Sequence, residues 1–81
     1  MKPSVGRIVI FVFPDGTNKC PAVVTNVWSD TCVNLHLLRD ADQNKITLDQ
    51  GNFPTSVPFD ETASGRQSWH WPPRVEEPTA V

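Results

Sequence analysis

Short runs of β-branched and aromatic residues, each closed by a turn signal, constrain this chain more than any other feature. The first run ends at Phe13 and is followed by Pro14-Asp15-Gly16, where proline presets φ and glycine accepts a positive φ. The expected strands are Gly6–Phe13, Pro21–Trp28, Cys32–Leu38, Thr55–Phe59 and Ser68–Trp71, and Lys45–Leu48 is expected to pair briefly. No segment sustains helical periodicity, so the pattern predicts an all-β fold.

The spacing of these segments favours one small architecture. Five short strands joined by turns predict an SH3-like barrel, and an OB-like barrel is the alternative. The 81 residues suit one domain. We place the barrel at residues 1–73 and an extended, proline-rich C-terminal arm at residues 74–81.

Side-chain alternation assigns faces to the strands. In the third segment Val33, Leu35 and Leu37 share one face, and Asn34 and His36 share the other, as in a half-buried antiparallel strand. The first segment is apolar on both faces, and one small barrel covers only one of them. This excess predicts a symmetric homo-oligomer with a dimer as its smallest unit.

Charge and hydropathy exclude several partners. The net charge is −2, which is not the basic footprint of a protein that binds duplex nucleic acid. No apolar stretch approaches the roughly 20 residues of a membrane helix. The N-terminal sequence lacks the apolar stretch of a signal peptide, so a cytoplasmic protein is expected.

The two cysteines do not predict a disulfide or a metal site. Cys20 and Cys32 form no CxxC pair, and His36 and His70 supply no closely spaced second pair. Disulfides are also rare in a reducing compartment. We therefore expect both cysteines to act as small, mostly buried hydrophobic residues, with no metal and no cofactor.

The sequence favours a protein that is not an enzyme. His70, Asp60 and several serines are present, but no serine lies in a nucleophile-elbow glycine pattern. Asp60 and Glu61 are adjacent, so on a strand they point to opposite faces. The glycines are isolated and form no phosphate-binding loop. No catalytic residue is assigned.

A set of aromatic, basic and polar residues is expected to bind a ligand instead. Aromatic rings can stack on a base, arginine can hold phosphate, and small polar side chains can fix orientation. The candidate residues are Asn34, His36, Thr55, Ser56, Arg66, Trp69, His70 and Trp71. The alternation within the last strand favours Trp69 in the core, Trp71 at the junction with the arm, and His70 as the outward group most free to meet a ligand.

Three blocks of the sequence carry a resemblance to known proteins. CVNLHLL, TSVPFDE and SWHWPPR, with the AVVTNVW segment ahead of them, are similar to blocks in a group of short phage-encoded proteins. The resemblance spans about Val5 to Arg74. It implies a phage origin and a location in the host cytoplasm. Small phage proteins of this kind are often virion accessories or counter-defence proteins, and some of the latter are compact oligomers that sequester nucleotide immune signals without cleaving them.

Two functional hypotheses follow from these observations. The first is a homo-oligomeric counter-defence protein that captures a small nucleotide-like ligand between subunits. The second is a structural or protein-interaction module, either a virion accessory or an inhibitor of a host protein, with Trp28, Trp69 and Trp71 as anchors. An enzyme ranks below both.

Overall fold

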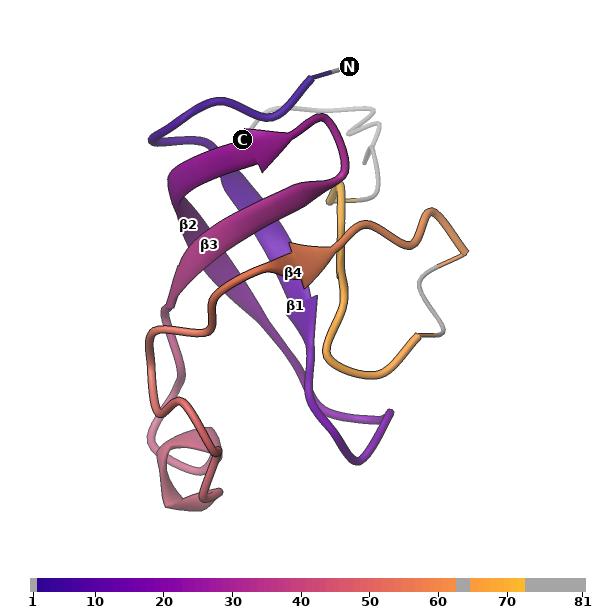
Figure 1. Cartoon of the computed structure of the whole chain (residues 1–81). Helices are drawn as coiled ribbons and strands as arrows, with labels where there is room; N and C mark the ends of the chain where they lie inside the picture. The colour runs from indigo at the N-terminus through magenta and orange to yellow at the C-terminus, as the bar shows by residue number, and fades with distance from the viewer. Residues whose placement is uncertain (1, 63–64, 73–81) are drawn as a thin grey trace, which may run out of the picture.

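A computed structural model describes residues 2–62 and 65–72 of the chain as a small, nearly closed all-β barrel of the SH3-like kind, which confirms the predicted fold class (Figure 1). Its sheet has five strands, and consecutive neighbours pair antiparallel. The elements are β1 (Ile8–Val12), β2 (Lys19–Ser29), β3 (Cys32–Leu37), the 3-10 turn η1 (Gln43–Lys45), β4 (Val57–Pro58) and β5 (Trp69–His70).

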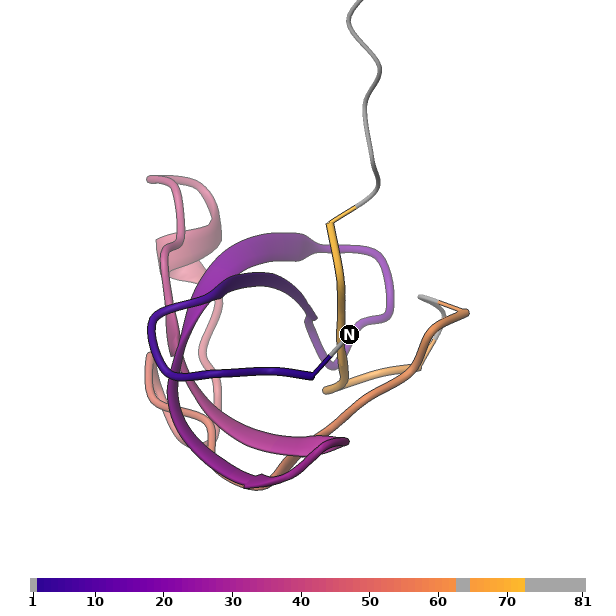
Figure 2. The same ribbon diagram turned by 90° about the horizontal axis from the view of Figure 1, so that it is seen from above.

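The order of the strands closes the barrel. The sheet runs β4-β3-β2-β1-β5, and Figure 2 shows the strands curving around a common centre. The two ends of the sheet meet through one parallel bridge between Phe59 and Trp69. The backbone N–H of Asp60 donates to the carbonyl of Trp69 at 2.9 Å across this seam.

The long strand β2 belongs to both halves of the barrel. Its first residues pair with β1, and the part from Ala22 to Ser29 pairs with β3. Two register shifts, between Val24 and Asn26 and between Val27 and Ser29, interrupt the second ladder. Such bulges increase the local twist and bend a strand, so they account for the strong curvature of β2 in Figure 1.

The core fills the inside of this curved sheet. Its buried members are Val9, Phe11, Phe13, Cys20, Ala22, Val24, Val33, Leu35, Leu37, Val57 and Trp69. The predicted alternation of β3 is confirmed, since Val33, Leu35 and Leu37 are buried and the residues between them are half-buried. On the other face of β1, Val12 is fully buried, Ile10 is half-buried and Ile8 is 45% exposed. One chain therefore covers this second apolar face only in part.

The short strand β4 contains a proline, Pro58. Proline has no backbone N–H to donate, so it suits the edge of a sheet or the end of a strand. β4 is the terminal strand of the sheet order and ends at Pro58. It is shorter than the predicted Thr55–Phe59 because Ser56 has a φ of 53°, which is outside the extended region.

The prediction that Lys45–Leu48 pairs as a strand is wrong. This region begins with η1, and the side chain of Arg39 holds it as a compact turn. The guanidinium donates to the carbonyls of Gln43 and Ile46 at 3.1 and 2.7 Å, and to Asn52 Oδ1 at 2.8 Å. Local composition did not reveal this arrangement because it depends on a side chain outside the segment.

Two further expectations concern a membrane-spanning helix and the C-terminal arm. No helix in residues 2–62 and 65–72 is long and apolar enough to cross a membrane. The predicted arm at residues 74–81 lies outside the described residues.

Candidate functional site

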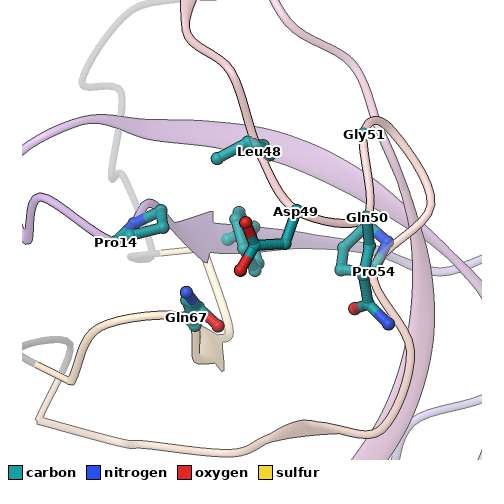
Figure 3. Close-up of a pocket in the computed structure, with 8 residues that line it drawn as sticks. Pro14, Leu48, Asp49, Gln50, Gly51, Pro54 and Gln67 are labelled. Carbon is teal, nitrogen blue, oxygen red and sulfur yellow. The ribbon is translucent and has the colours of Figure 1, made fainter.

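A pocket of about 270 Å³ opens at one end of the barrel. It lies where the turn after β1, the loop before β4 and the turn before β5 meet (Figure 3). Its lining residues are Phe11, Pro14, Leu48, Asp49, Gln50, Gly51, Pro54 and Gln67. Polar and apolar atoms contribute about equally to this lining, and three polar side chains take part in it, those of Asp49, Gln50 and Gln67. A concave site in which a few polar groups converge is a candidate small-molecule site.

The three polar side chains differ in how they are engaged. Gln50 is held by Thr55, because its Nε2 donates to Thr55 Oγ1 at 2.9 Å and its Oε1 accepts from the Thr55 backbone N–H at 3.0 Å. The side chains of Asp49 and Gln67 make no hydrogen bond to any described residue. In Figure 3 the Asp49 carboxylate is directed toward the side of the pocket where Pro14 and Gln67 lie. Asp49 and Gln67 are therefore available to a ligand.

The backbone around the pocket is unusual at two lining positions. Gly51 has a φ of 60°, which suits a residue without a Cβ. Gln67 has a φ of 54°, although a side chain rarely adopts this conformation, and its N–H donates to the Val12 carbonyl at 2.9 Å. Backbone strain of this kind clusters at functional sites. It is a second reason to regard this end of the barrel as the candidate site.

Arg66 does not line the pocket, but it lies beside the turn after β1 that borders it, and we call this position the rim. Its side chain covers the turn after β1, since a Cβ built on Gly16 would lie 3.2 Å from Arg66 Nε. Gly16 is two residues beyond the lining residue Pro14, and Arg66 itself precedes the lining residue Gln67. None of the lining residues is a lysine or an arginine. Arg66 is therefore placed to supply positive charge outside the pocket.

Three of the predicted ligand-binding residues, Asn34, His36 and Ser56, gather around the outer face of β3. Asn34 Oδ1 accepts from Trp28 Nε1 at 2.8 Å and from the Ser56 backbone N–H at 2.9 Å. The ring of His36 stacks on Phe53 with 4.7 Å between centroids. Thr55 is exposed and instead holds the pocket residue Gln50. Asn34 therefore positions the loop before β4 against β3, and Thr55 positions Gln50.

The two tryptophans of the last strand occupy different positions. Trp69 is in the core, where its ring lies 4.7 Å from that of Phe59. Trp71 is half-buried and meets Trp69 edge-on, with 5.3 Å between centroids. The Arg7 guanidinium carbon lies 6.0 Å from the centre of the Trp71 ring. Trp71 also lines a shallow groove formed with Gly6, Arg7, Ile8 and Pro72.

The expectation that His70 is an outward, accessible group is wrong. Only 8% of His70 is exposed, and its Nδ1 is buried with no hydrogen-bond partner among the described residues. As the alternation predicts, His70 and Trp69 point to opposite faces of β5. The face with His70 is covered, however, and Lys19 and Asp60 are near enough to affect the charge of the imidazole.

Burial makes His70 a source of pH-dependent stability. Desolvation, and then the charge of Lys19, lower the pKa of His70, and Asp60 opposes this in part. The unfolded chain therefore takes up a proton near pH 6.5 while the folded chain resists it. We expect the urea midpoint to fall as the pH is lowered from 7 to 5. The variant His70→Gln should lose this part of the slope, and an equal slope in both proteins would contradict the prediction.

Sequence reasoning missed the residues that build the pocket. Asp49 and Gly51 belong to a stretch that reads as an ordinary polar turn, and Gln67 belongs to the loop before the last strand. No spacing connects them, because only closure of the barrel brings the two loops together. The structure therefore divides the predicted set between the core, the outer face of β3, the Trp71 groove and the rim of the pocket.

Neither a search for metal-binding groups nor comparison with known proteins assigns a function to any further residue. Within residues 2–62 and 65–72 no three His, Cys, Asp or Glu side chains are grouped so that they would hold a metal ion. Comparisons with family models, curated proteins and solved structures find no match for this chain.

Proposed function

We propose that this chain is a non-enzymatic binding protein that sequesters a small nucleotide-like ligand, with the base in the pocket and the phosphate toward Arg66. The observation that carries the proposal is the pocket itself. The apolar half of its lining, which includes Pro14, Leu48 and Pro54, suits the faces of a planar ring, and the unengaged Asp49 and Gln67 suit its polar edge. Arg66 at the rim supplies the bidentate donor that phosphate requires.

The chemistry of the lining supports binding without cleavage. The described residues that line the pocket include no serine, cysteine or histidine. The resemblance of the CVNLHLL, TSVPFDE and SWHWPPR blocks to short phage-encoded proteins supports a role in counter-defence, in which a captured host signal is withheld from its receptor. Host cytoplasm is the location that this role requires.

The size of the pocket limits how much ligand one copy can hold. A volume of about 270 Å³ lies just below the range typical of small-molecule sites, roughly 300–1,000 Å³. It accommodates a base with part of its sugar, so a larger ligand would extend beyond the rim. A homo-oligomer would enclose the remainder between copies. A strictly monomeric mass in light scattering at micromolar protein, with ligand present, would contradict this part of the proposal.

A thermal-shift and calorimetry screen tests the binding function. The probes are nucleoside monophosphates, ADP-ribose and cyclic dinucleotides. A ligand at about 100 times its Kd stabilises the fold by about 2.7 kcal/mol, which is a measurable shift in Tm. Recovery of the ligand unchanged after denaturing the protein would support sequestration. The absence of a shift with every probe would refute the proposal.

A matched pair of variants locates the site. Leu48→Trp places a larger side chain in the wall of the pocket and should abolish binding. Leu38→Trp makes the same change at a residue that is 45% exposed and does not line the pocket, so it should bind as the wild type does. Equal binding by both variants would move the site away from this pocket.

A second function is favoured by one separate observation. Trp28 and Phe53 are each 62% exposed, and hydrogen bonding to Asn34 and stacking on His36 hold them in place. Preformed aromatic groups are common anchors for protein partners. The chain would then be a structural or protein-interaction module, such as a virion accessory or an inhibitor of a host protein. Loss of a stoichiometric partner in the Trp28→Ala and Phe53→Ala variants, with no small-molecule effect, would favour it.

A further inference from the structure

We propose that the pocket selects guanine among the nucleobases, and that Asp49 is the residue that determines this selectivity. The inference rests on the proposed function, since it names the class of ligand that the same pocket takes. Among the described residues that line the pocket, Asp49 is the only charged one, and its carboxylate has no partner within the described part of the chain.

A carboxylate restricts the groups that a ligand can present to it. Its two oxygens only accept hydrogen bonds, so they favour a ligand with two adjacent N–H donors. Guanine presents N1–H and the N2 amino group side by side on one edge. Adenine and cytosine each place a ring acceptor beside their amino group, and uracil places a carbonyl on either side of N3–H. The carboxylate therefore repels part of the edge of each base except guanine.

The remaining groups of the pocket agree with a guanine ligand. The Gln67 side chain offers an N–H₂ donor that suits guanine O6, and it lines the same pocket as Asp49. Pro14, Leu48 and Pro54 provide apolar surface for the faces of the ring (Figure 3). Gln50 contributes less to selectivity because Thr55 occupies both ends of its amide. The negative charge of Asp49 also directs the phosphate out of the pocket, toward Arg66.

Calorimetry with the 5′-monophosphates of guanosine, inosine, adenosine, cytidine and uridine tests the selectivity. A bidentate contact to a base edge discriminates by about 1–3 kcal/mol, or roughly 5- to 150-fold. Because Asp49 is exposed to solvent, we expect a preference of about 10-fold for guanosine over adenosine. Inosine keeps N1–H and lacks the N2 amino group, so it should bind with intermediate affinity.

A matched pair of carboxamide variants assigns the effect to Asp49. Asp49→Asn keeps the size of the side chain and replaces one acceptor with a donor, so it should reduce the preference for guanosine to less than about 2-fold. Asp30→Asn makes the same change in the exposed turn between β2 and β3, away from the pocket, and should keep the full preference. Tm values measured without ligand establish that both variants are folded.

The outcomes separate the two proposals. If no nucleotide binds, the proposed function fails. If all five bind within 2-fold of one another, the function stands and the guanine inference is overturned. N-methylguanidinium presents the same pair of donors from a different source, so it serves as a further probe. Tighter binding of this cation than of guanosine monophosphate would also overturn the inference.

Discussion

Replacing Trp69 with alanine is expected to remove about half of the free energy of unfolding and to lower the urea midpoint strongly. Trp69 is 1% exposed, pairs with Phe11 across the β5–β1 ladder, and contacts Phe59 and Trp71. Truncation of a buried tryptophan costs about 3–5 kcal/mol. A domain of this size has a total stability on the order of 5–10 kcal/mol. The far-ultraviolet circular dichroism and the urea midpoint of Trp69→Ala measure the loss.

Trp28 supplies the matched control for this experiment. It is 62% exposed, and its main contact is the hydrogen bond from its indole to Asn34. Trp28→Ala should therefore cost no more than about 1 kcal/mol. Trp69→Phe gives a second check, because it keeps an aromatic ring and removes an N–H that has no partner among the described residues. An unfolding midpoint of Trp69→Ala equal to that of Trp28→Ala would show that the barrel does not depend on its last strand.

The strands could be predicted from the sequence because their signals are local. The run that ends at Phe13 contains the residues that strands favour, and the Asp15 side chain then accepts the backbone N–H groups of Thr17 and Asn18 to form the turn. These two hydrogen bonds lower the pKa of Asp15 to about 2. Alternation along β3 likewise identified its buried face. In each case residues within a few positions of one another determine the structure.

The candidate site could not be predicted because it depends on closure. Gln67 comes to line the same pocket as Asp49 only when β5 pairs with β1 and the seam at Phe59 forms. His70 was assigned to the outside by its place in the strand, but a covered side of β5 cannot be inferred from alternation alone. Arg66 was selected for its charge, and its place at the rim follows from a contact with Gly16, which is remote in the sequence. The chemistry of a side chain could therefore be used to choose candidate residues, whereas the sequence did not indicate which of them lie together in the folded chain.

Replacing Phe59 with alanine should open the seam that closes the barrel. Its ring is half-buried and tilted by 51° against Trp69, with 4.7 Å between centroids. The backbone bond across the seam, from the Asp60 N–H to the Trp69 carbonyl, does not involve the ring, and the Phe59 N–H donates to the Thr31 carbonyl beside β3. Because the side chain is only partly buried, we expect a loss of about 2 kcal/mol in the free energy of unfolding, measured from urea midpoints.

A double-mutant cycle isolates the ring contact itself. Leucine at Phe59 and at Trp69, singly and together, should give a coupling energy of about 0.5–1.5 kcal/mol, which is typical of an aromatic pair. The control cycle replaces Phe53, whose ring stacks on His36, together with Trp69. It should be additive within about 0.5 kcal/mol. Additivity in the Phe59 cycle as well would mean that the seam is held by its backbone bonds. The pocket, which needs both loops in place, would then tolerate the loss of the Phe59 ring.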